Sequence, residues 1–202
     1  FSPFTLNNGE RSHYGYGWRL GQMYDRPVVE HGGGINGFLT QSIYVPEEKL
    51  FVAVFSNCNC QSPSIAANKM AALALGEWKT FREIPLDMNT LQQYTGVYKT
   101  EEGDQHKVVL DNGKLYTMSR GGNRYVLTPM GKDWFFFEDQ LRTVQFVKNE
   151  EGKVVKVKAY ERGTLQGEAV RTDEVVAAQP SIALSEAELL EYTGTFDMGP
   201  FQ

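Results

Sequence analysis

The residues most able to do chemistry lie together in residues 27–38. An apolar run in this stretch ends at His31 and is followed directly by Gly32, Gly33 and Gly34. Three consecutive glycines leave no side chain to keep another molecule away from the backbone. A histidine next to bare backbone amides can polarise a carbonyl group or hold a carboxylate. We therefore predict a binding edge here, at the margin of a β-sheet.

Each of these residues also has a purely structural interpretation. One alternative is that His31 only ends a strand, with its ring hydrogen-bonded to the protein. Another is that the three glycines form a flexible loop, but this leaves residues 36–38 and the hairpin pattern after them unexplained. The functional interpretation of His31 is therefore favoured. His13 and His106 lie in polar segments that predict turns, so we expect both to be solvated.

The strands that position this edge are indicated by alternating and continuous apolar runs. Residues 14–20 alternate large and small side chains, which predicts a strand with its aromatic rings on one face. Residues 21–26 predict a turn. Residues 41–45 and 50–55 predict two further strands joined by the turn at residues 46–49, and the second strand is expected to be buried on both faces.

A helix is predicted after this hairpin. Ser62 and Pro63 are typical of a helix start, and Gly76 is typical of a helix end. Residues 65–75 between them are rich in alanine. The residues expected near the packed face are Ile65, Met70, Leu73 and Ala74. Three or four antiparallel strands followed by a helix that packs back on them form half of an α+β domain.

From residue 84 to about residue 171 the sequence consists of strand and turn patterns. Short runs rich in β-branched and aromatic residues predict strands at 94–100, 107–110, 114–118, 125–129, 134–137, 143–148, 154–160 and 167–170. About eight strands joined by tight turns predict an up-and-down meander closed into a small barrel. The aromatic run at residues 134–137 is expected to fill the barrel core and leave one ring exposed, although a small barrel can also hold an apolar guest.

One internal repeat is visible in the sequence. Seven residues recur in the same order at one constant offset: Ile84, Leu86, Leu91, Tyr94, Thr95, Gly96 and Tyr98 match Ile182, Leu184, Leu189, Tyr192, Thr193, Gly194 and Phe196. The favoured explanation is that a second copy of the barrel begins near Ser181, and a chance match is the alternative. The predicted domains are therefore residues 1–80, 84–175 and 181–202.

Composition limits the classes of partner. The net charge is −5 with a pI near 5.3, and the Lys and Arg residues are scattered, so nucleic acid is not an expected partner. No apolar run reaches the length needed to cross a bilayer, and no leader pattern opens the chain. Cys58 and Cys60 lack a second ligand pair, so no metal site is expected, and we predict two free thiols. No cofactor is expected.

The N-terminal quarter resembles the end of the serine β-lactamase and penicillin-binding-protein superfamily. The resemblance rests on residues 31–38, on residues 14–18 before them, and on the hairpin and helix after them. It is strongest to the branch of class C β-lactamases, D-alanyl-D-alanine carboxypeptidases, D-aminopeptidases and esterases. Residues 86–171 are similar to the lipocalin-like barrel that many of these proteins carry. The expected fold class is therefore α+β: an antiparallel sheet and helix remnant, followed by an all-β up-and-down barrel.

The resemblance implies roles for four residues. In this family the strand beside the nucleophile carries Lys-Thr-Gly or, in several peptidases and esterases, His-x-Gly, and His31 begins the second form. His31 would be a catalytic residue that orients substrate and supports proton transfer, and the Gly34 N–H would be an oxyanion-hole donor. Gly32 and Gly33 would bind substrate by letting an acyl group lie along the strand.

Two motifs of the family are missing from these 202 residues. No serine is followed three positions later by lysine, and no Tyr-x-Asn or Ser-x-Asn is present. The chain is therefore expected to be a C-terminal hydrolase fragment that is inactive alone, with small peptides, β-lactams or esters as substrates through an upstream half-domain. The alternative is a non-catalytic, lipocalin-like binding or oligomerisation module. The resemblance implies an extracytoplasmic location, and an open strand edge beside His31 predicts self-association.

Overall fold

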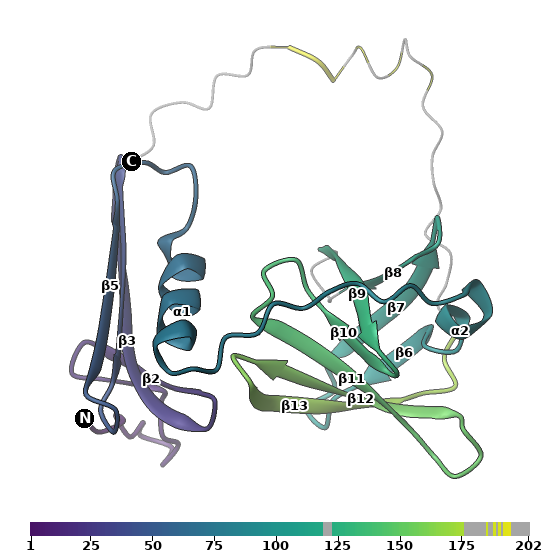
Figure 1. The fold of residues 1–202 in the computed structure, drawn as a ribbon, viewed down its shortest axis with the longest axis horizontal. Coiled ribbons are helices and arrows are strands. Elements are labelled where there is room, and N and C mark those ends of the chain that lie inside the picture. Colours follow the sequence, from purple (N-terminus) through teal and green to yellow (C-terminus); the bar gives the residue numbers. More distant parts are fainter. Residues whose placement is uncertain (119–122, 176–184, 186–187, 189, 191, 195–202) are drawn as a thin grey trace.

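The chain folds into two units. The computed structural model describes residues 1–118 and 123–175, together with residues 185, 188, 190 and 192–194. A five-stranded antiparallel sheet backed by one helix forms the first unit, and a closed eight-stranded barrel forms the second (Figure 1). The predicted second barrel-like repeat at residues 181–202 lies almost wholly outside the described residues.

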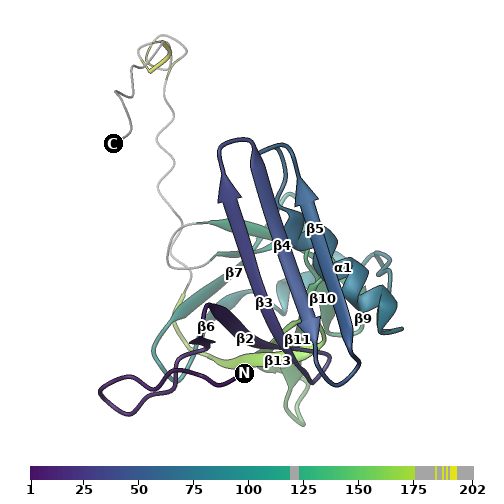
Figure 2. The same ribbon diagram turned by 90° about the vertical axis from the view of Figure 1, so that its left-hand side faces the viewer.

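The sheet is a series of hairpins. Its strands, in spatial and chain order, are β1 (Tyr14–Gly15), β2 (Trp18–Met23), β3 (Arg26–Ile35), β4 (Phe38–Val45) and β5 (Leu50–Ser56). Figure 2 shows β3, β4 and β5 side by side, with helix α1 (Pro63–Ala74) behind them. The hairpin order places β3, which carries His31, between β2 and β4.

The N-terminal aromatic segment differs from its prediction. Residues 14–20 form two short strands rather than one, because Tyr16 and Gly17 have positive φ angles of 53° and 81° and form a tight turn. The turn predicted at residues 21–26 is confined to Tyr24 and Asp25, whose φ angles are 49° and 62°. The large-small alternation therefore identified strand residues but not the turn within them.

Helix α1 begins and ends as predicted. The Ser62 side chain accepts a hydrogen bond from the Ser64 N–H, and Gly76 follows the helix with a φ of 73°. The predicted packed face is wrong: Ile65, Met70 and Leu73 are exposed. The buried residues are instead Pro63, Ala67, Asn68, Ala71 and Ala72. Small side chains allow the helix to lie close against the sheet.

Strand β5 is buried on one face only. Phe51 and Phe55 are 59% and 79% exposed, whereas Val52 between them is 8% exposed. The prediction of burial on both faces is therefore wrong, because β5 is the outermost strand and α1 covers only the face of Val52.

The barrel is an uninterrupted meander. Its strands are β6 (Gly96–Lys99), β7 (Gln105–Asp111), β8 (Lys114–Met118), β9 (Arg124–Gly131), β10 (Trp134–Phe136), β11 (Arg142–Lys148), β12 (Val154–Glu161) and β13 (Thr164–Arg171). Each strand pairs antiparallel with the next, and β13 returns to β6 through the Val170–Lys99 and Arg171–Tyr98 pairs. The predicted up-and-down barrel is thereby confirmed.

Aromatic rings fill one half of the barrel. Tyr94, Phe135 and Phe146 are fully buried, and their ring centroids lie 4.8–5.4 Å apart. The short helix α2 (Met88–Gln92) adds Leu91 to this core. Trp134 lies against Tyr160 instead, with 5.3 Å between the ring centroids.

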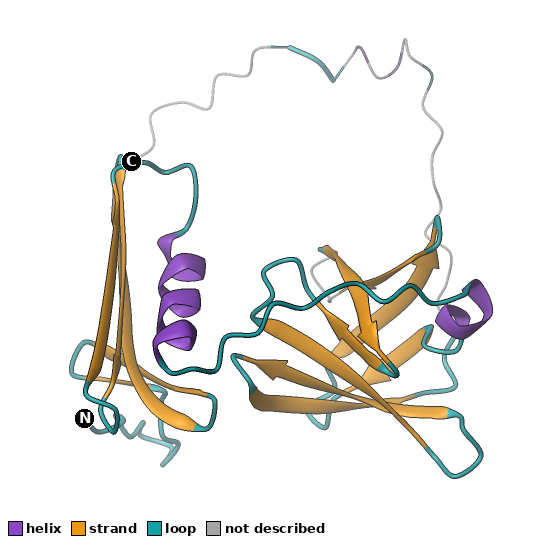
Figure 3. Cartoon of the chain, in the orientation of Figure 1, coloured by secondary structure: helices purple, strands orange, loops and turns teal. Residues whose placement is uncertain are grey.

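The fold class predicted as α+β is wrong for the described chain. Strands make up most of its regular secondary structure, and the helices α1 and α2 have 12 and 5 residues (Figure 3). No helical part of a β-lactamase-like domain occurs among the residues that the structure describes. The described chain is mostly β because α1 alone covers the sheet and almost everything after residue 95 joins the barrel.

The prediction of two free thiols is also corrected. Cys58 and Cys60 form a disulfide in the loop after β5. Their Cα atoms lie 5.3 Å apart, which is within the range that a disulfide spans, despite the single residue between them.

Candidate functional site

His31 lies in the middle of β3 rather than at its end. The strand continues through the three glycines to Ile35, because Gly32, Gly33 and Gly34 all pair with residues of β4. Neither the strand end expected at His31 nor a flexible glycine loop is present. The four predicted site residues therefore occupy consecutive positions of one regular strand.

One side of this strand segment is an open edge. Arg19–Glu30 is the last pair between β2 and β3, whereas pairing with β4 continues to Ile35–Phe38. Within the described chain, the segment from His31 to Ile35 therefore has a partner strand on one side only. Such an edge presents backbone donors and acceptors to other molecules.

The hairpin turn decides which peptide groups face this edge. A two-residue turn at Asn36-Gly37 makes Ile35 and Phe38 a hydrogen-bonded pair. Hydrogen-bonded pairs recur at every second residue, so Gly33 directs its peptide groups toward β4. Gly32 and Gly34 consequently direct their N–H and C=O groups toward the open edge.

The His31 ring is held at both nitrogen atoms. Nδ1 lies 2.5 Å from the Gly32 carbonyl oxygen, and Nε2 lies 2.8 Å from the Tyr14 hydroxyl. A carbonyl oxygen only accepts hydrogen bonds, so a neutral ring in this position carries its proton on Nδ1 and accepts from Tyr14 at Nε2. The edges of the Tyr14 and Trp18 rings pack around the imidazole. The ring is thus oriented while remaining exposed to solvent.

The glycines leave little room for side chains. A Cβ atom added at Gly33 would lie 2.7 Å from Thr40 Oγ1. One added at Gly32 would lie 3.0 Å from Gln41 Oε1, and one at Gly34 would lie equally close to the Leu39 side chain. Glycine therefore serves close packing within the sheet as well as access to the backbone.

A cavity of about 450 Å³ borders His31 and is completed by the barrel. The sheet unit lines this cavity with His13, Tyr14, Arg19, Glu30, Gln41 and Ser64. Glu161 and Arg162, from the turn between β12 and β13, line the same cavity. The two units therefore share one polar site.

An ion pair joins the two units at this cavity. The Arg162 guanidinium donates from Nη1 to Glu30 Oε2 at 2.8 Å and from Nη2 to Glu30 Oε1 at 3.3 Å. Its Nη1 also donates to Asn68 Oδ1 of α1 at 3.1 Å. Both charged side chains are nearly buried, at 12% and 10% exposure. Tyr24 N–H adds a bond to the Arg162 carbonyl at 2.7 Å.

Sequence reasoning missed Tyr14, Glu30 and Arg162. Tyr14 was identified only as part of an aromatic strand. Nothing in the sequence pairs Glu30 with Arg162, because 132 positions separate them. A charged residue in an otherwise apolar strand, such as Glu30 after Val28 and Val29, is the one local signal of a buried partner.

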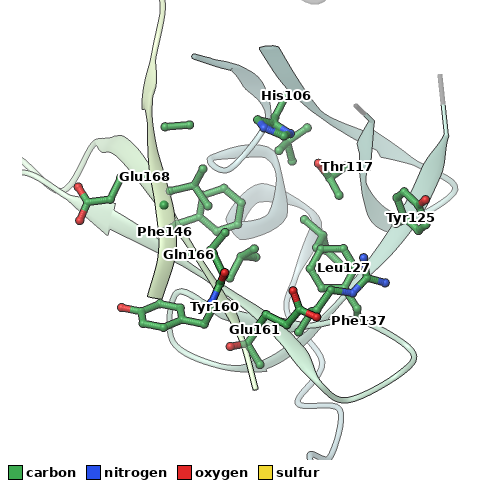
Figure 4. A pocket seen from close by; sticks show the side chains of 18 of the residues that line it. His106, Thr117, Tyr125, Leu127, Phe137, Phe146, Tyr160, Glu161, Gln166 and Glu168 are labelled. Carbon is green, nitrogen blue, oxygen red and sulfur yellow. The ribbon is translucent and has the colours of Figure 1, made fainter. Parts of the chain in front are cut away.

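His106 was assigned to a polar turn, and that assignment is wrong. It lies in β7, where it is half-buried and borders a second cavity inside the barrel (Figure 4). His13, in contrast, lies outside the regular strands, as predicted. Within the described residues, no cluster of three or more His, Cys, Asp or Glu side chains could hold a metal ion.

Comparison with known proteins relates the chain to penicillin-binding proteins. No family model matches it. The chain is 30% identical over 182 residues to penicillin-binding protein 4* of Bacillus subtilis, covering 85% of this chain and 40% of that protein. It is 30% identical over 99 residues to a D-aminopeptidase of Gluconobacter oxydans, covering 48% of this chain and 17% of that protein. The chain thus spans less than half the length of either relative.

Solved structures with partial likeness include an octameric penicillin-binding protein homologue from Pyrococcus abyssi. It is 23% identical, with a TM-score of 0.33, over 81% of this chain and 37% of that chain. SurE with D-Leu is 19% identical, with a TM-score of 0.37, over 85% of this chain and 40% of that chain. The sequence similarities are to a penicillin-binding protein and to a D-aminopeptidase.

No helix in the described part of the chain combines the length and the apolar character needed to cross a membrane.

Proposed function

We propose that this chain is the C-terminal part of a penicillin-binding-protein-related serine hydrolase that transfers an acyl group to water. The observation that carries the proposal is the open edge of β3, where the peptide groups of Gly32 and Gly34 point outward beside an oriented His31. The sequence similarity to penicillin-binding protein 4* supports the same class of activity.

In this proposal each edge residue has a separate role. A serine from outside these 202 residues attacks the acyl carbon, the amine or alcohol leaves with a proton, and water then hydrolyses the ester. The Gly34 N–H donates to the oxygen that becomes negative. Gly32 and Gly33 allow the acyl chain to lie along β3 as an added strand. His31 exchanges its Nε2 hydrogen bond with Tyr14 for one to the substrate, and it then orients the substrate and assists proton transfer.

The same proposal includes the branch of the family, the type of barrel, the domain bounds and the location. The similarity to a D-aminopeptidase supports the branch of D-amino-acid peptidases and esterases related to class C β-lactamases. The closed meander of eight strands supports a lipocalin-like barrel. Residues 1–80 would then belong to the hydrolase domain, residues 84–175 to the barrel and residues 181–202 to a second barrel. An extracytoplasmic location follows from the family resemblance.

Active-site labelling tests the proposal. A fluorescent β-lactam or phosphonate probe should leave the 202-residue chain unlabelled and should acylate the longer protein that includes the upstream sequence. In that longer protein, His31→Ala should slow labelling by about 100-fold, a typical loss for a proton-transfer residue. His13→Ala is the matched control, because His13 borders the same cavity, and it should label normally.

Two results would contradict this assignment. Labelling of the 202-residue chain would show that one of its own serines is activated without a lysine. Unchanged labelling of the His31→Ala protein would remove His31 from the mechanism.

The orientation of the His31 ring can be tested in this chain alone. Tyr14→Phe removes the hydroxyl bonded to Nε2, so the ¹⁵N chemical shift of Nε2 should change, while the Gly32 carbonyl still holds the proton on Nδ1 and the fold remains intact. Imidazole ¹⁵N chemical shifts report the tautomer directly. Tyr16→Phe is the control, because Tyr16 is 93% exposed. Identical His31 shifts in all three proteins would show that the Tyr14 hydroxyl does not bond to Nε2.

The open edge also supports self-association of the chain. The outward-facing N–H groups of Gly32 and Gly34 and the Gly34 carbonyl can pair with the same edge of a second copy. Light scattering should detect a dimer or larger species. A strictly monomeric chain at high concentration would exclude this pairing.

A second candidate function is a non-catalytic binding module formed by the barrel. It is favoured by one observation, a cavity of about 420 Å³ within the barrel. This volume falls in the range of small-molecule sites, which is roughly 300–1,000 Å³.

A further inference from the structure

The barrel is filled at one end and open at the other. Met88 of α2 lies beside Gly113, in the turn between β7 and β8, so α2 covers that end. In an up-and-down barrel, alternate turns lie at opposite ends. Thr117, Tyr125 and Arg142 adjoin turns of the opposite end, and all three line the cavity. The cavity therefore opens at the end away from α2.

The wall of this cavity is mainly apolar. The apolar side chains that line it are Val108, Leu127, Phe137, Val144, Phe146, Val157, Ala159 and Ala169. Figure 4 shows His106, Thr117 and Tyr125 on one side of the space and Glu161 and Gln166 on the opposite side. An apolar interior with polar groups at its mouth suits a ligand that has an apolar body and a polar head.

The positive charge at the mouth is already compensated. Arg142 Nε donates to Asp139 Oδ2 at 2.7 Å, and its guanidinium lies over the Phe137 ring, 4.6 Å from the centroid. Glu168 borders the cavity but is directed away from it in Figure 4. It binds Lys156 and Lys158 at 2.7 and 3.0 Å.

The negative charge at the mouth is not compensated. The Glu161 carboxylate has no ion-pair partner among the residues that the structure describes. Gln166 lies nearby, and its amide N–H donates to the Thr164 carbonyl at 3.2 Å, which leaves the Gln166 carbonyl oxygen as an acceptor. The mouth thus offers two acceptors, one of them charged, and a ligand must supply the donors.

We propose that the barrel binds an apolar primary amine, with its alkyl or aromatic body in the cavity and its ammonium group on Glu161 and the Gln166 carbonyl oxygen. An ammonium group has three donors and the charge opposite to that of Glu161. A carboxylate head would instead meet Glu161 as a like charge. This inference names the ligand class for the second candidate function and rests on it. Glu161 also lines the cavity that borders His31.

Three ligands that each have ten carbon atoms and differ in their polar head provide the test. Decylamine, decanol and decanoate are titrated calorimetrically into the 202-residue protein, each below its micelle concentration. We expect decylamine to bind about tenfold more tightly than decanol, as for a charge-assisted hydrogen bond, and decanoate to bind most weakly.

Variants of this protein test whether the ligands bind in the barrel cavity. Glu161→Gln should reduce decylamine affinity to about that of decanol without changing decanol binding. Glu150→Gln is the matched control, because it makes the same charge change in the turn between β11 and β12, at the opposite end of the barrel. Ala159→Phe should abolish binding of all three ligands by filling the cavity. Since Ala159 is exposed to the open space, the larger ring should leave the fold intact.

The outcomes separate the inference from the function on which it rests. Equal affinity for all three heads, or decylamine binding that Glu161→Gln leaves unchanged, would overturn the amine class while the barrel remained a binding module. If none of the three ligands binds, both the amine class and the binding-module function are overturned.

Discussion

At the scale of single residues, Asp133 organises the polar part of the barrel core. Its carboxylate accepts from the Tyr94 hydroxyl and from Lys148 Nζ, each at 2.8 Å. Burial opposes ionisation of Asp133, but the hydrogen bonds from Lys148 and Tyr94 outweigh it and lower the pKa of the carboxyl group. Burial and the neighbouring Asp133 raise the pKa of Tyr94, so the pair stays as phenol and carboxylate.

The lowered pKa of Asp133 predicts a pH-dependent contribution to stability. A carboxyl group whose pKa is lower in the folded state stabilises the protein fully at pH values above its unfolded pKa of about 3.9. This stabilisation is lost as the pH falls through the folded pKa. Asp133→Asn should therefore reduce the free energy of unfolding by about 2 kcal/mol at neutral pH. It should also weaken the acid dependence of stability.

Urea unfolding at neutral and acidic pH measures this effect. Asparagine tolerates the positive φ of 64° at this position, so backbone strain should not contribute. Asp104→Asn, at an exposed site, is the control. An Asp133→Asn protein that lost as much stability in acid as the parent would show that this carboxylate is not the source of the acid dependence.

At the scale of elements, α1 packs through its small residues. Ala67 and Ala71 are fully buried against Val28, Ile43 and Val52 of the sheet. The larger Ile65, Met70 and Leu73 are exposed. Helix position thus depends on close approach to the sheet rather than on large apolar side chains.

This packing predicts a large effect of one substitution in α1 and a small effect of another. Ala71→Leu inserts a large side chain where the helix meets the sheet and should lower the free energy of unfolding by about 1–3 kcal/mol. Leu73→Gln, at a 67% exposed position, should change it by less than about 0.5 kcal/mol. Thermal and urea unfolding compare the two proteins. The reverse order would show that the larger residues form the packed face.

At the scale of the whole molecule, Arg162 couples the barrel to the sheet. Arg162 lies in the turn between β12 and β13, and its guanidinium donates hydrogen bonds to Glu30 and Asn68. Because Glu30 precedes His31, this contact also supports the strand that carries the candidate site. A buried ion pair is sensitive to loss of one partner, because the other charge is then left without compensation.

Removing one partner of the Arg162–Glu30 pair should lower the free energy of unfolding more than removing both partners. Arg162→Met leaves Glu30 buried and unpaired, and should lower the free energy of unfolding by about 3–5 kcal/mol. The double variant Arg162→Met/Glu30→Met should recover much of that loss. Lys153→Met is the control, since its ion pair with Glu151 is highly exposed. Chemical unfolding measures all four proteins, and equal losses in the single and double variants would contradict a coupled pair.

Features that depend on local sequence were predictable. Alternating β-branched and aromatic residues separated by turn formers indicated all eight barrel strands, because side-chain period and turn conformation are properties of neighbouring residues. The start and end of α1 were equally local. Local pattern failed where two residues with positive φ interrupted an aromatic run, at Tyr16 and Gly17.

The candidate site was only partly predictable for the same reason. The His31–Gly34 motif could be identified because its residues are consecutive. Its surroundings could not, since Tyr14 reaches His31 only across the β1–β2 and β2–β3 hairpins, and Arg162 reaches Glu30 only from the barrel.

The sequence by itself determined the order of the strands, the closed meander and the position of the glycine-flanked histidine. Tertiary structure alone decided which face of α1 is buried, that β3 keeps an open edge past Glu30, and that Glu161 faces a cavity with no ion-pair partner in the described part of the chain. The physical reason is the distance along the chain over which each kind of interaction acts. Strand period and turn conformation act between neighbours, whereas burial, edge exposure and charge pairing depend on chain segments that only the complete fold brings together.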